Sequence, residues 1–295
     1  GEKFFMKMFL RLFMAAAAIA LLSIAFSACG KEYTRDKGDQ WKENYDISSP
    51  NLENAGKDAE HSNSDGWYLT LEENFDGDTL PETFAPSPHK LRKTEYWCDE
   101  MISVRDGNAV IKAAHETNHQ CPVCNVAEGD FTSGIETMKT VDGKTTPLFE
   151  QAFGYFEARV KLPQSGGMWS AFWLQSRSTG NIGFEGQDGT EIDIYESSFF
   201  RTDKTKMGHA LHYDGYDPKY HRCQDTIRDT GIDLYDGYHT FALKWTPEEY
   251  AFYIDGKVTW ASDFGGVSKV PAYLRFTNEV RPNQTGPYGS EIRRF

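Results

Sequence analysis

GYFEARVKL, at residues 154–162, alternates strictly between apolar and polar side chains. Successive side chains of a β-strand point to opposite faces, so this period of two predicts a strand with one buried face. The polar face of that strand should meet solvent. The buried side chains are expected to be Phe156, Ala158, Val160 and Leu162.

Further strands are predicted downstream, at residues 241–245 and 250–254, and Asp255-Gly256 is typical of a tight hairpin turn. The chain shows no long helical periodicity that would compete with strands. Many short strands joined by polar turns predict an all-β protein, a β-sandwich or jelly roll of two antiparallel sheets.

The composition fits one large domain of this kind. The chain has 295 residues, of which 39% are hydrophobic, and this is enough to bury a substantial core. A formal net charge of −13 and a pI near 5.1 leave no basic stripe for phosphates, which argues against nucleic acid as a partner. A neutral polymer fits better, although an acidic surface is also ordinary for soluble exported proteins.

The N-terminus is typical of a secretion signal. Lys7 and Arg11 precede an uncharged run over residues 12–28, which ends in small residues before Cys29. This arrangement resembles a bacterial lipobox, so residues 1–29 are predicted to be a lipoprotein signal peptide with Cys29 as the lipidation site. A retained transmembrane helix is the alternative, but the run is shorter than the roughly 20 residues that span a bilayer. We expect an exported protein, lipid-anchored to a bacterial membrane or cell surface.

Two segments follow the signal. Residues 30–66 are polar and lack sustained periodicity, which predicts a flexible linker that holds the rest of the chain away from a membrane. A loosely packed extension of the domain is the alternative. Residues 67–295 are predicted to form a single domain.

Acidic residues cluster in GTEIDIYES, at residues 189–197. In a strand, Glu191 and Asp193 project on one face while the isoleucines project into the core. Glu196 has the wrong parity and joins that face only if a β-bulge adds one residue near Ile194. Three carboxylates on one face repel one another, which favours a catalytic use over metal binding or a solvated acidic edge.

A pair of tryptophans lies nearby in GMWSAFWLQ, at residues 167–175. Strand parity places Trp169 and Trp173 on one face and Phe172 and Leu174 on the other. Indole faces pack well on the CH faces of sugar rings. Because the opposite face already carries apolar side chains for the core, we expect Trp169 and Trp173 to bind a sugar.

These motifs resemble those of glycoside hydrolase family 16, and the bulged acidic motif is the form found in its laminarinases and agarases. The resemblance covers roughly residues 67–278 and implies a concanavalin-like jelly roll with an open substrate cleft on its concave sheet. It rests on EIDIYE at 191–196, WSAFW at 169–173, FEARVKLP at 156–163 and YHTFALKWTP at 238–247.

The resemblance also implies that residues 67–295 form a retaining hydrolase, with Glu191 as nucleophile, Glu196 as acid/base and Asp193 as the residue that orients the nucleophile. Retaining hydrolysis needs one carboxylate that attacks the anomeric carbon and one carboxylic acid that protonates the leaving oxygen. We expect no cofactor and no metal in catalysis, and a protein that acts as a monomer.

Two further polar residues are candidates for binding the sugar. Arg159 lies on the polar face of its predicted strand, and His212 lies in the segment HALHYD at residues 209–214. A structural role fits each of them equally well.

The expected reaction is endo-acting hydrolysis of a β-1,3- or β-1,3-1,4-glucan, because the tryptophan and His-Tyr segments look closer to laminarinases than to galactan-cleaving relatives. Agarase or carrageenase activity is the alternative, and a transglycosylase would share every catalytic residue. A non-catalytic carbohydrate-binding lectin is less favoured, since a binder needs the tryptophans but not three acids. Retention requires the carboxyl groups of Glu191 and Glu196 to lie within about 6.5 Å of each other.

The remaining cysteines are Cys98, Cys121, Cys124 and Cys223. An even number in an oxidising setting predicts one or two disulfides, with three full pairings open. Cys121-Pro-Val-Cys124 alone could belong to a zinc site, but no second pair at finger spacing accompanies it.

Family members often carry a structural calcium on the convex side, near a closing strand of the Asp-Tyr-Val-Arg-Val-Tyr type. No such strand is recognisable in GSEIRRF, at residues 289–295. Two points are therefore left open: whether the protein binds a structural calcium, and whether the sandwich lacks its last strand. A missing last strand would expose the edge of the neighbouring strand.

Overall fold

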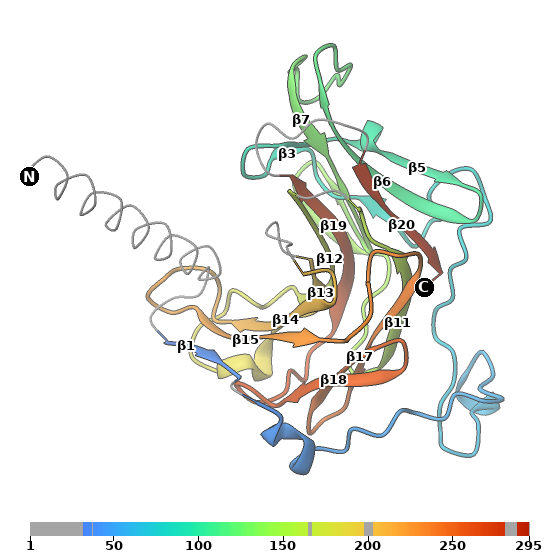
Figure 1. Ribbon diagram of the computed structural model, residues 1–295, viewed down its shortest axis with the longest axis vertical. Helices are drawn as coiled ribbons and strands as arrows, with labels where there is room; N and C mark the ends of the chain where they lie inside the picture. Colours follow the sequence, from blue (N-terminus) through green and yellow to red (C-terminus); the bar gives the residue numbers. More distant parts are fainter. Residues whose placement is uncertain (1–31, 37, 165–166, 198–202, 281–287, 295) are drawn as a thin grey trace, which may run out of the picture.

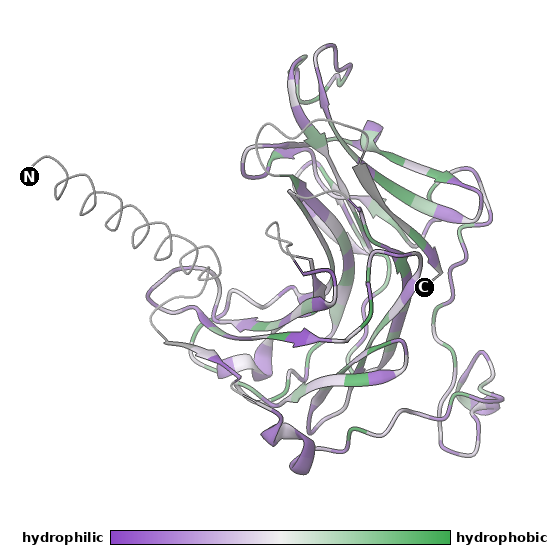
Figure 2. Ribbon diagram, viewed as in Figure 1, coloured by the Kyte–Doolittle hydropathy of each residue, from purple (hydrophilic) through white to green (hydrophobic). Residues whose placement is uncertain are grey.

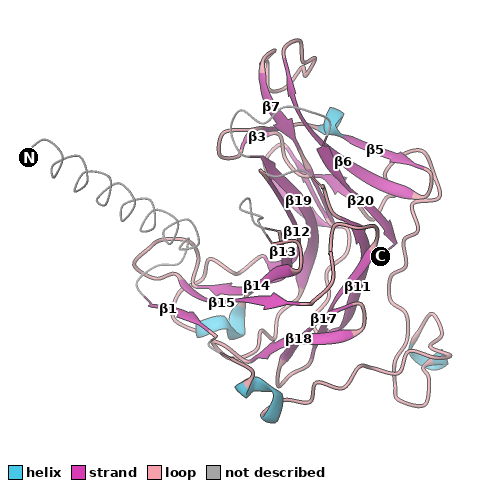
Figure 3. Cartoon of the chain, in the orientation of Figure 1, coloured by secondary structure: helices cyan, strands magenta, loops and turns pink. Residues whose placement is uncertain are grey.

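The computed structural model describes residues 32–36, 38–164, 167–197, 203–280 and 288–294. Almost all regular structure in these ranges is β-strand (Figure 3), and no helix among them is long and apolar enough to cross a bilayer. The helical turns are the short 3-10 helices η1 (Gln40–Glu43), η2 (Ala59–His61), η3 (Asp99–Met101) and η4 (Glu185–Asp188).

Two large sheets form the molecule (Figure 1). The eight-stranded sheet has the order β1 (Glu32–Arg35), β15 (Arg222–Asp229), β14 (Lys206–Tyr213), β13 (Glu191–Glu196), β12 (Met168–Ser176), β19 (Ala272–Val280), β8 (Gly134–Glu136) and β2 (Ala85–Pro86). The ten-stranded sheet has the order β18 (Lys257–Ser262), β17 (Tyr250–Ile254), β16 (His239–Trp245), β11 (Gly154–Lys161), β20 (Tyr288–Arg294), β6 (Asn108–Glu116), β7 (Gly129–Thr132), β4 (Tyr96–Trp97) and β3 (Lys90–Leu91), with β5 (Ile102–Arg105) paired to β6.

Neighbouring strands run antiparallel, apart from the parallel pairs β1–β15 and β4–β7. A separate hairpin is formed by β9 (Met138–Val141) and β10 (Lys144–Pro147). The predicted all-β jelly-roll sandwich is therefore confirmed.

The core lies between the two large sheets. From β11, Phe156, Ala158 and Val160 point into it as their alternation predicts, and they pack in one cluster with Phe172 of β12 and Ile192 of β13. Figure 2 shows the apolar residues concentrated on the strands and the polar ones on the connections. Each fully buried aliphatic or aromatic side chain contributes roughly 1.5–3 kcal/mol to stability, so this cluster is what holds the sheets face to face.

The C-terminal residues Tyr288–Arg294 form a strand, β20, inside the ten-stranded sheet. β20 pairs with β11 on one edge and with β6 on the other, and Ile292 is fully buried in the main core. Its sequence, YGSEIRR, has only one aliphatic residue, so periodicity could not identify it. Backbone pairing on both edges explains why so polar a segment forms a central strand.

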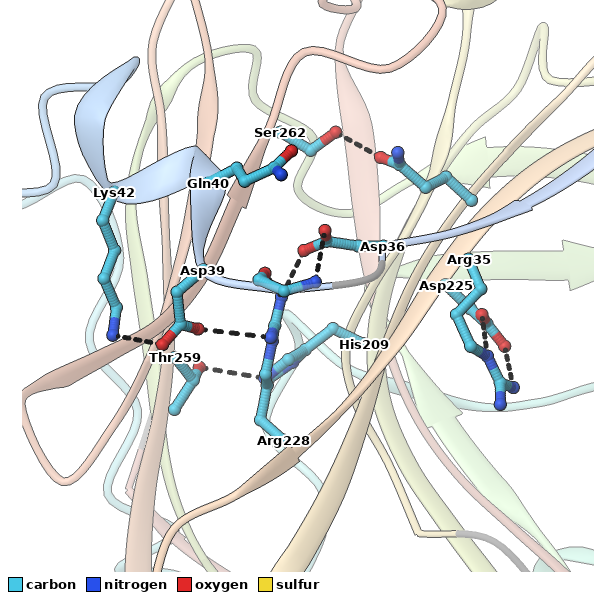
Figure 4. Close-up of polar contacts among 12 residues, drawn as sticks. Arg35, Asp36, Asp39, Gln40, Lys42, His209, Asp225, Arg228, Thr259 and Ser262 are labelled. Carbon is cyan, nitrogen blue, oxygen red and sulfur yellow. Dashed lines mark hydrogen bonds and ion pairs between the residues drawn. The ribbon is translucent and has the colours of Figure 1, made fainter.

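Part of the segment predicted as a flexible linker packs on the sandwich. β1 extends the eight-stranded sheet at β15, and Trp41 of η1 is 5% exposed within the main core. Arg228 of β15 forms ion pairs with Asp36 and Asp39 (Figure 4). Residues 49–66, in contrast, contain no buried residue. The domain boundary at residue 67 stays a prediction, but residues 32–48 do not behave as a free tether.

The predicted signal peptide and its lipidation site, Cys29, lie outside the described residues.

Candidate active site

The acid-bearing strand β13 contains the bulge that its sequence predicts. On the β12 side, Phe172 lies opposite Tyr195 and Trp173 lies opposite Asp193, which leaves Ile194 as the extra residue. On the β14 side, the register shifts between Asp193 and Glu196. The extra residue changes the parity of the strand, so Glu196 joins the face of the preceding acids while Ile194 and Tyr195 are both buried in the core.

A buried histidine stabilises this bulge. The bulge removes the Ile194 carbonyl from the regular ladder, and His209 Nδ1 lies 2.7 Å from that oxygen, while Nε2 lies 2.9 Å from Thr259 Oγ1. Burial lowers the pKa of His209 to about 4, so its imidazole is neutral at pH 7. Nδ1–H therefore donates to Ile194, and Nε2 accepts from the Thr259 hydroxyl.

Glu191, Asp193 and Glu196 project from the outer face of this central strand. Glu191 is 8% exposed and Asp193 is 3% exposed, whereas Glu196 is partly exposed. A carboxylate oxygen of Glu191, one of Asp193 and a ring nitrogen of His212 all lie within 4.8 Å of one another. The sheet thus concentrates negative charge at a point where little water reaches it.

Glu191 is held by two donors that meet at one of its oxygens. Gln175 Nε2 donates to Glu191 Oε2 over 3.2 Å, and the Tyr216 hydroxyl donates to the same oxygen. The Gln175 amide is itself fixed, because its Oε1 accepts from Tyr273 at 2.7 Å and from Arg275 at 3.0 Å. Within the described chain, the hydrogen bonds to Glu191 all reach Oε2 and none reaches Oε1.

The other two acids have separate partners. His212 Nε2 lies 3.2 Å from Asp193 Oδ2, and His212 Nδ1 lies 3.0 Å from Nε2 of His221. Trp169 Nε1 donates to Glu196 Oε1 over 3.1 Å. These contacts fix the orientation of each carboxyl group independently of the others.

The electrostatics separate the protonation states of the acids. Burial, with the nearby Asp193 charge second, raises the pKa of Glu191 to about 7. The same two causes raise the pKa of Glu196 well above its ordinary value. Burial alone would lower the pKa of His212, but its hydrogen bond to Asp193 and the surrounding carboxylates raise it to about 9. His212 is therefore a cation near neutral pH that offsets part of the negative charge.

Strand β19, the neighbour of β12 on the side away from β13, completes the floor of the site. Its alternate residues Tyr273, Arg275 and Thr277 face the same way as the acids, paired across from β12. Arg275 stacks its guanidinium 4.1 Å from the Trp173 ring and pairs with Glu136 at 2.9 Å. A hollow of about 270 Å³ opens beside Gln175 and Tyr216, the two donors to Glu191. Its lining includes Met138, Gln175, Arg177, Thr179, Tyr216 and Tyr273.

The structure brings most of the predicted site residues together. Trp169 is bonded to Glu196, Trp173 stacks on Arg275, and His212 is bonded to Asp193. Arg159 is not part of this group. It lies on β11 of the other large sheet, with its guanidinium 4.8 Å from the Tyr238 ring. The polar face of β11 is the outer face of the ten-stranded sheet. Strand parity predicts which side chains are polar and exposed, but it does not predict the sheet to which a strand belongs.

Four site residues were missed by sequence reasoning: Gln175, Tyr216, Tyr273 and Arg275. Gln175 lies on the face already assigned to Trp169 and Trp173, and a face assignment extended to AYLRFTNEV, residues 272–280, would have found Tyr273 and Arg275. Tyr216 lies in a connection after β14, where no periodicity exists. Only its three-dimensional position reveals it.

Two groups of side chains in the described chain have the geometry to hold a metal ion. The first is Glu191, Asp193 and His212, but here an imidazole already pairs with Asp193, and Glu191 already accepts two hydrogen bonds. The second group contains cysteines and lies apart from the acids.

Cys98, Cys121 and Cys124 are free thiols, so the disulfides predicted to involve them are absent. Cys98 Sγ and Cys124 Sγ are 3.3 Å apart, compared with about 2.05 Å for a disulfide bond. The expectation was wrong for these three cysteines because it rested only on their even number and on an oxidising setting.

The fold and the acid-bearing bulged strand define the class of jelly-roll glycoside hydrolases. Comparison with known proteins agrees: residues 101–264 match the family model described as glycosyl hydrolases family 16. The chain belongs to this family.

Curated relatives include the endo-1,3-1,4-beta-glycanase ExsH of Rhizobium meliloti (strain 1021), 27% identical over 175 residues, which are 59% of this chain and 32% of the relative. The beta-glucanase of Rhodothermus marinus is 30% identical over 72% of this chain and 66% of its own length. The chain thus spans between about a third and two thirds of these relatives.

Solved structures share the fold. The catalytic domain of an endo-1,3-beta-glucanase (laminarinase) from Thermotoga petrophila superposes with a TM-score of 0.60 at 21% identity, over 77% of this chain and 96% of that one. An endo-beta-1,3-glucanase from Pyrococcus furiosus gives a TM-score of 0.58 at 20% identity, over 77% of this chain and 92% of that one.

Proposed function

We propose that the protein is an endo-acting, retaining glycoside hydrolase that cleaves β-1,3- or β-1,3-1,4-glucan. One observation carries the proposal: the bulge in β13 sets three carboxyl groups on one face, where separate donors bond Glu191 and Glu196 and the His212 imidazole pairs with Asp193. The chemistry uses side chains and water and requires no cofactor.

In the first step, Glu191 attacks the anomeric carbon through its carboxylate oxygen Oε1. Glu196 gives its proton to the glycosidic oxygen as the carbon–oxygen bond breaks, and a covalent glycosyl ester on Glu191 forms. Glu196 then takes a proton from water, and the water oxygen attacks the anomeric carbon and releases Glu191. The raised pKa of Glu196 suits the acid role, because a carboxyl group must hold its proton to protonate the leaving oxygen.

Asp193 supports this cycle as a positioning residue. Its carboxylate lies between the two glutamates in sequence and binds the His212 imidazolium, so its charge raises the pKa of Glu196 and Glu191. Trp169 is partly exposed beside Glu196, where its ring suits sugar CH groups. Trp173 is 7% exposed beneath Arg275 and supports the floor of the site.

The mechanism is tested by Glu191→Gln. The variant should lose at least ~10³-fold in kcat, because the amide is not a nucleophile, while binding of a laminarin oligosaccharide stays within a few-fold, since shape is conserved. Isothermal titration calorimetry and reducing-sugar release separate the two quantities. Turnover close to that of the unchanged protein would contradict the catalytic assignment.

The substrate is inferred from the names of the relatives, which are beta-glucanases and endo-1,3-1,4-beta-glycanases. Reducing-sugar release should be measured in parallel on laminarin, lichenan, agarose and carrageenan. We expect laminarin or lichenan to be cleaved at least ten times faster than either galactan, with oligosaccharides of mixed length as early products. Proton NMR of those products should show the β-anomer first.

We also propose that the protein is exported and lipid-anchored through Cys29, and that it acts as a monomer. The basis is the charged, apolar and small-residue pattern of residues 1–29. Cys29→Ser should release the protein from the membrane fraction into the soluble fraction. Persistence in the membrane would favour a spanning helix instead.

A further inference from the structure

Three thiols and one imidazole converge at the edge of the ten-stranded sheet, away from the acid-bearing strand. Cys98 directly follows β4, and His119, Cys121 and Cys124 lie in the connection between β6 and β7. One ligand atom from each of the four side chains lies within 4.8 Å of all the others. These four residues are called the Cys₃His cluster below.

The distances suit a tetrahedral ion. Zn–S bonds of about 2.3 Å and Zn–N bonds of about 2.0 Å place two tetrahedral sulfur ligands about 3.8 Å apart, and a sulfur and a nitrogen about 3.5 Å apart. Cys98 Sγ and Cys124 Sγ are 3.3 Å apart. Small shifts of side chains would thus bring the four atoms around one zinc ion.

His119 is prepared for a metal on one side of its ring. Its Nδ1 lies 2.7 Å from Glu116 Oε2, so this carboxylate accepts the Nδ1–H and leaves the lone pair on Nε2. Nε2 is buried and has no hydrogen-bond partner among the described residues. A carboxylate behind a metal-binding imidazole is the usual arrangement at zinc sites, because it fixes the tautomer and the ring orientation. Stacking on Phe131, at 3.7 Å between ring centres, holds the ring further.

The Cys121 sulfur has a backbone donor suited to a thiolate. The backbone N–H of Cys124 donates to Cys121 Sγ over 3.2 Å, and His89 Nδ1 lies 3.7 Å from the same sulfur. Such contacts stabilise negative charge on a metal-bound sulfur. An uncharged set of buried thiols would have no need of them.

We propose that the Cys₃His cluster binds one structural Zn²⁺ ion. All four ligands come from the protein, which leaves no open position for substrate, so the ion is structural and not catalytic. It ties the long connection between β6 and β7 to the end of β4. The segment that leads into β4 contains Lys93, whose Nζ lies 4.3 Å from the centre of the Trp169 ring. By holding the end of β4 in place, the ion also supports this wall beside the acids.

The proposal is tested on the full chain, purified in detergent without chelator and without a histidine tag. We expect about one zinc per chain by inductively coupled plasma mass spectrometry. Replacement by Co²⁺ should give the intense visible absorption of a tetrahedral cobalt thiolate. Less than about 0.2 zinc per chain, even after reconstitution with zinc under reducing conditions, would overturn the proposal.

Variants identify the ligands. Cys121→Ser and His119→Gln should each weaken zinc retention against a competing chelator at least ten-fold. His115→Gln is the matched control, because His115 lies on β6 and pairs with Asp130 outside the cluster. Equal retention in all three variants would contradict the assignment.

Alkylation of the unchanged protein provides a test that does not depend on whether a variant folds. The unchanged protein, denatured in the presence of chelator and without reductant, should have Cys98, Cys121 and Cys124 all modified by iodoacetamide. Peptide mass spectrometry that finds a disulfide between any two of them would overturn the zinc proposal.

Discussion

Glu191 and Glu196 are the same residue type on one strand, and their surroundings give them different chemistry. Glu191 accepts from an amide and a phenol at one oxygen, whereas Glu196 accepts only from an indole N–H among the described residues. More donors stabilise a carboxylate, so Glu191 ionises more readily than Glu196. Burial and the Asp193 charge raise the pKa of both groups, so the difference in hydrogen bonding is what distinguishes them.

Glu196→Ala should separate the two steps of catalysis. Without the proton donor, kcat on laminarin or lichenan should fall roughly 10²–10⁴-fold, while the first step on aryl glycosides with good leaving groups should stay measurable, since these need no proton. Burst kinetics with a nitrophenyl glucoside of suitable length would check this. An equal loss on both kinds of substrate would argue against the acid/base role.

Tyr216→Phe should change the pH dependence of activity. Glu191 must be ionised to attack, and its pKa of about 7 means that kcat/KM declines as the pH falls through that value. The Tyr216 hydrogen bond lowers the pKa of Glu191, so its loss should move this acid limb upward by about 0.4 to 1 pH unit.

The measurement is a kcat/KM profile from pH 4 to pH 9 on one glucan. Tyr220→Phe is the control, since Tyr220 is a tyrosine of the same connection that makes no contact with the acids among the described residues. A downward shift in Tyr216→Phe, or the same shift in both variants, would contradict the assigned hydrogen bond.

At the residue scale, the sequence allowed the three acids and both tryptophans to be placed, because strand parity depends only on neighbours along the chain. It could not place Tyr216 or reject Arg159. Both depend on which segments the fold brings together, and Tyr216 approaches Glu191 from 25 positions further along the chain. The spatial proximity of Cys98 and His119 was missed for the same reason, since 20 residues separate them in the sequence and no local pattern links them.

Among the elements, β13 depends on its neighbours for the bulge that makes it functional. The parity of the acids already required an extra residue, so the bulge could be predicted from sequence. Its support could not, because His209 comes from β14 and Thr259 from β18 of the opposite sheet. The polar strand β20 shows the same limit: its place in the sheet is set by β6 and β11 and not by its own composition.

His209→Ala should therefore impair both stability and catalysis. The Ile194 carbonyl would be left buried without its donor, which costs about 1–3 kcal/mol of unfolding free energy. The bulge would also relax, so kcat should fall at least ten-fold with little change in KM. His209→Asn can still donate to the carbonyl and should recover part of kcat. Urea denaturation and initial rates give the two quantities, and recovery of stability without kcat would limit His209 to a structural role.

Across the whole molecule, the N-terminal segment is tied to both large sheets by contacts of different kinds. The charged contacts of Arg228 with Asp36 and Asp39 are partly exposed and contribute little on their own. Lys244 donates to the backbone carbonyls of Asp46 and Ser48 and joins the same segment to β16. The apolar contact is Trp41, whose ring packs into the main core beneath Arg228.

Trp41→Ala tests whether this segment belongs to the folded unit. Removal of a buried tryptophan that packs on the core should lower the free energy of unfolding by about 3–5 kcal/mol, as core aromatic truncations do, and a tether would show almost no effect. Leu52→Ala is the matched control, because Leu52 is 44% exposed in the part of the segment that contains no buried residue, so its change should stay within about 0.5 kcal/mol. Urea denaturation followed by tryptophan fluorescence and by circular dichroism measures both variants. If the Trp41→Ala protein is as stable as the Leu52→Ala protein, residues 32–48 act as a linker. If the Trp41→Ala protein unfolds in a single cooperative transition at lower urea, these residues are part of the catalytic domain.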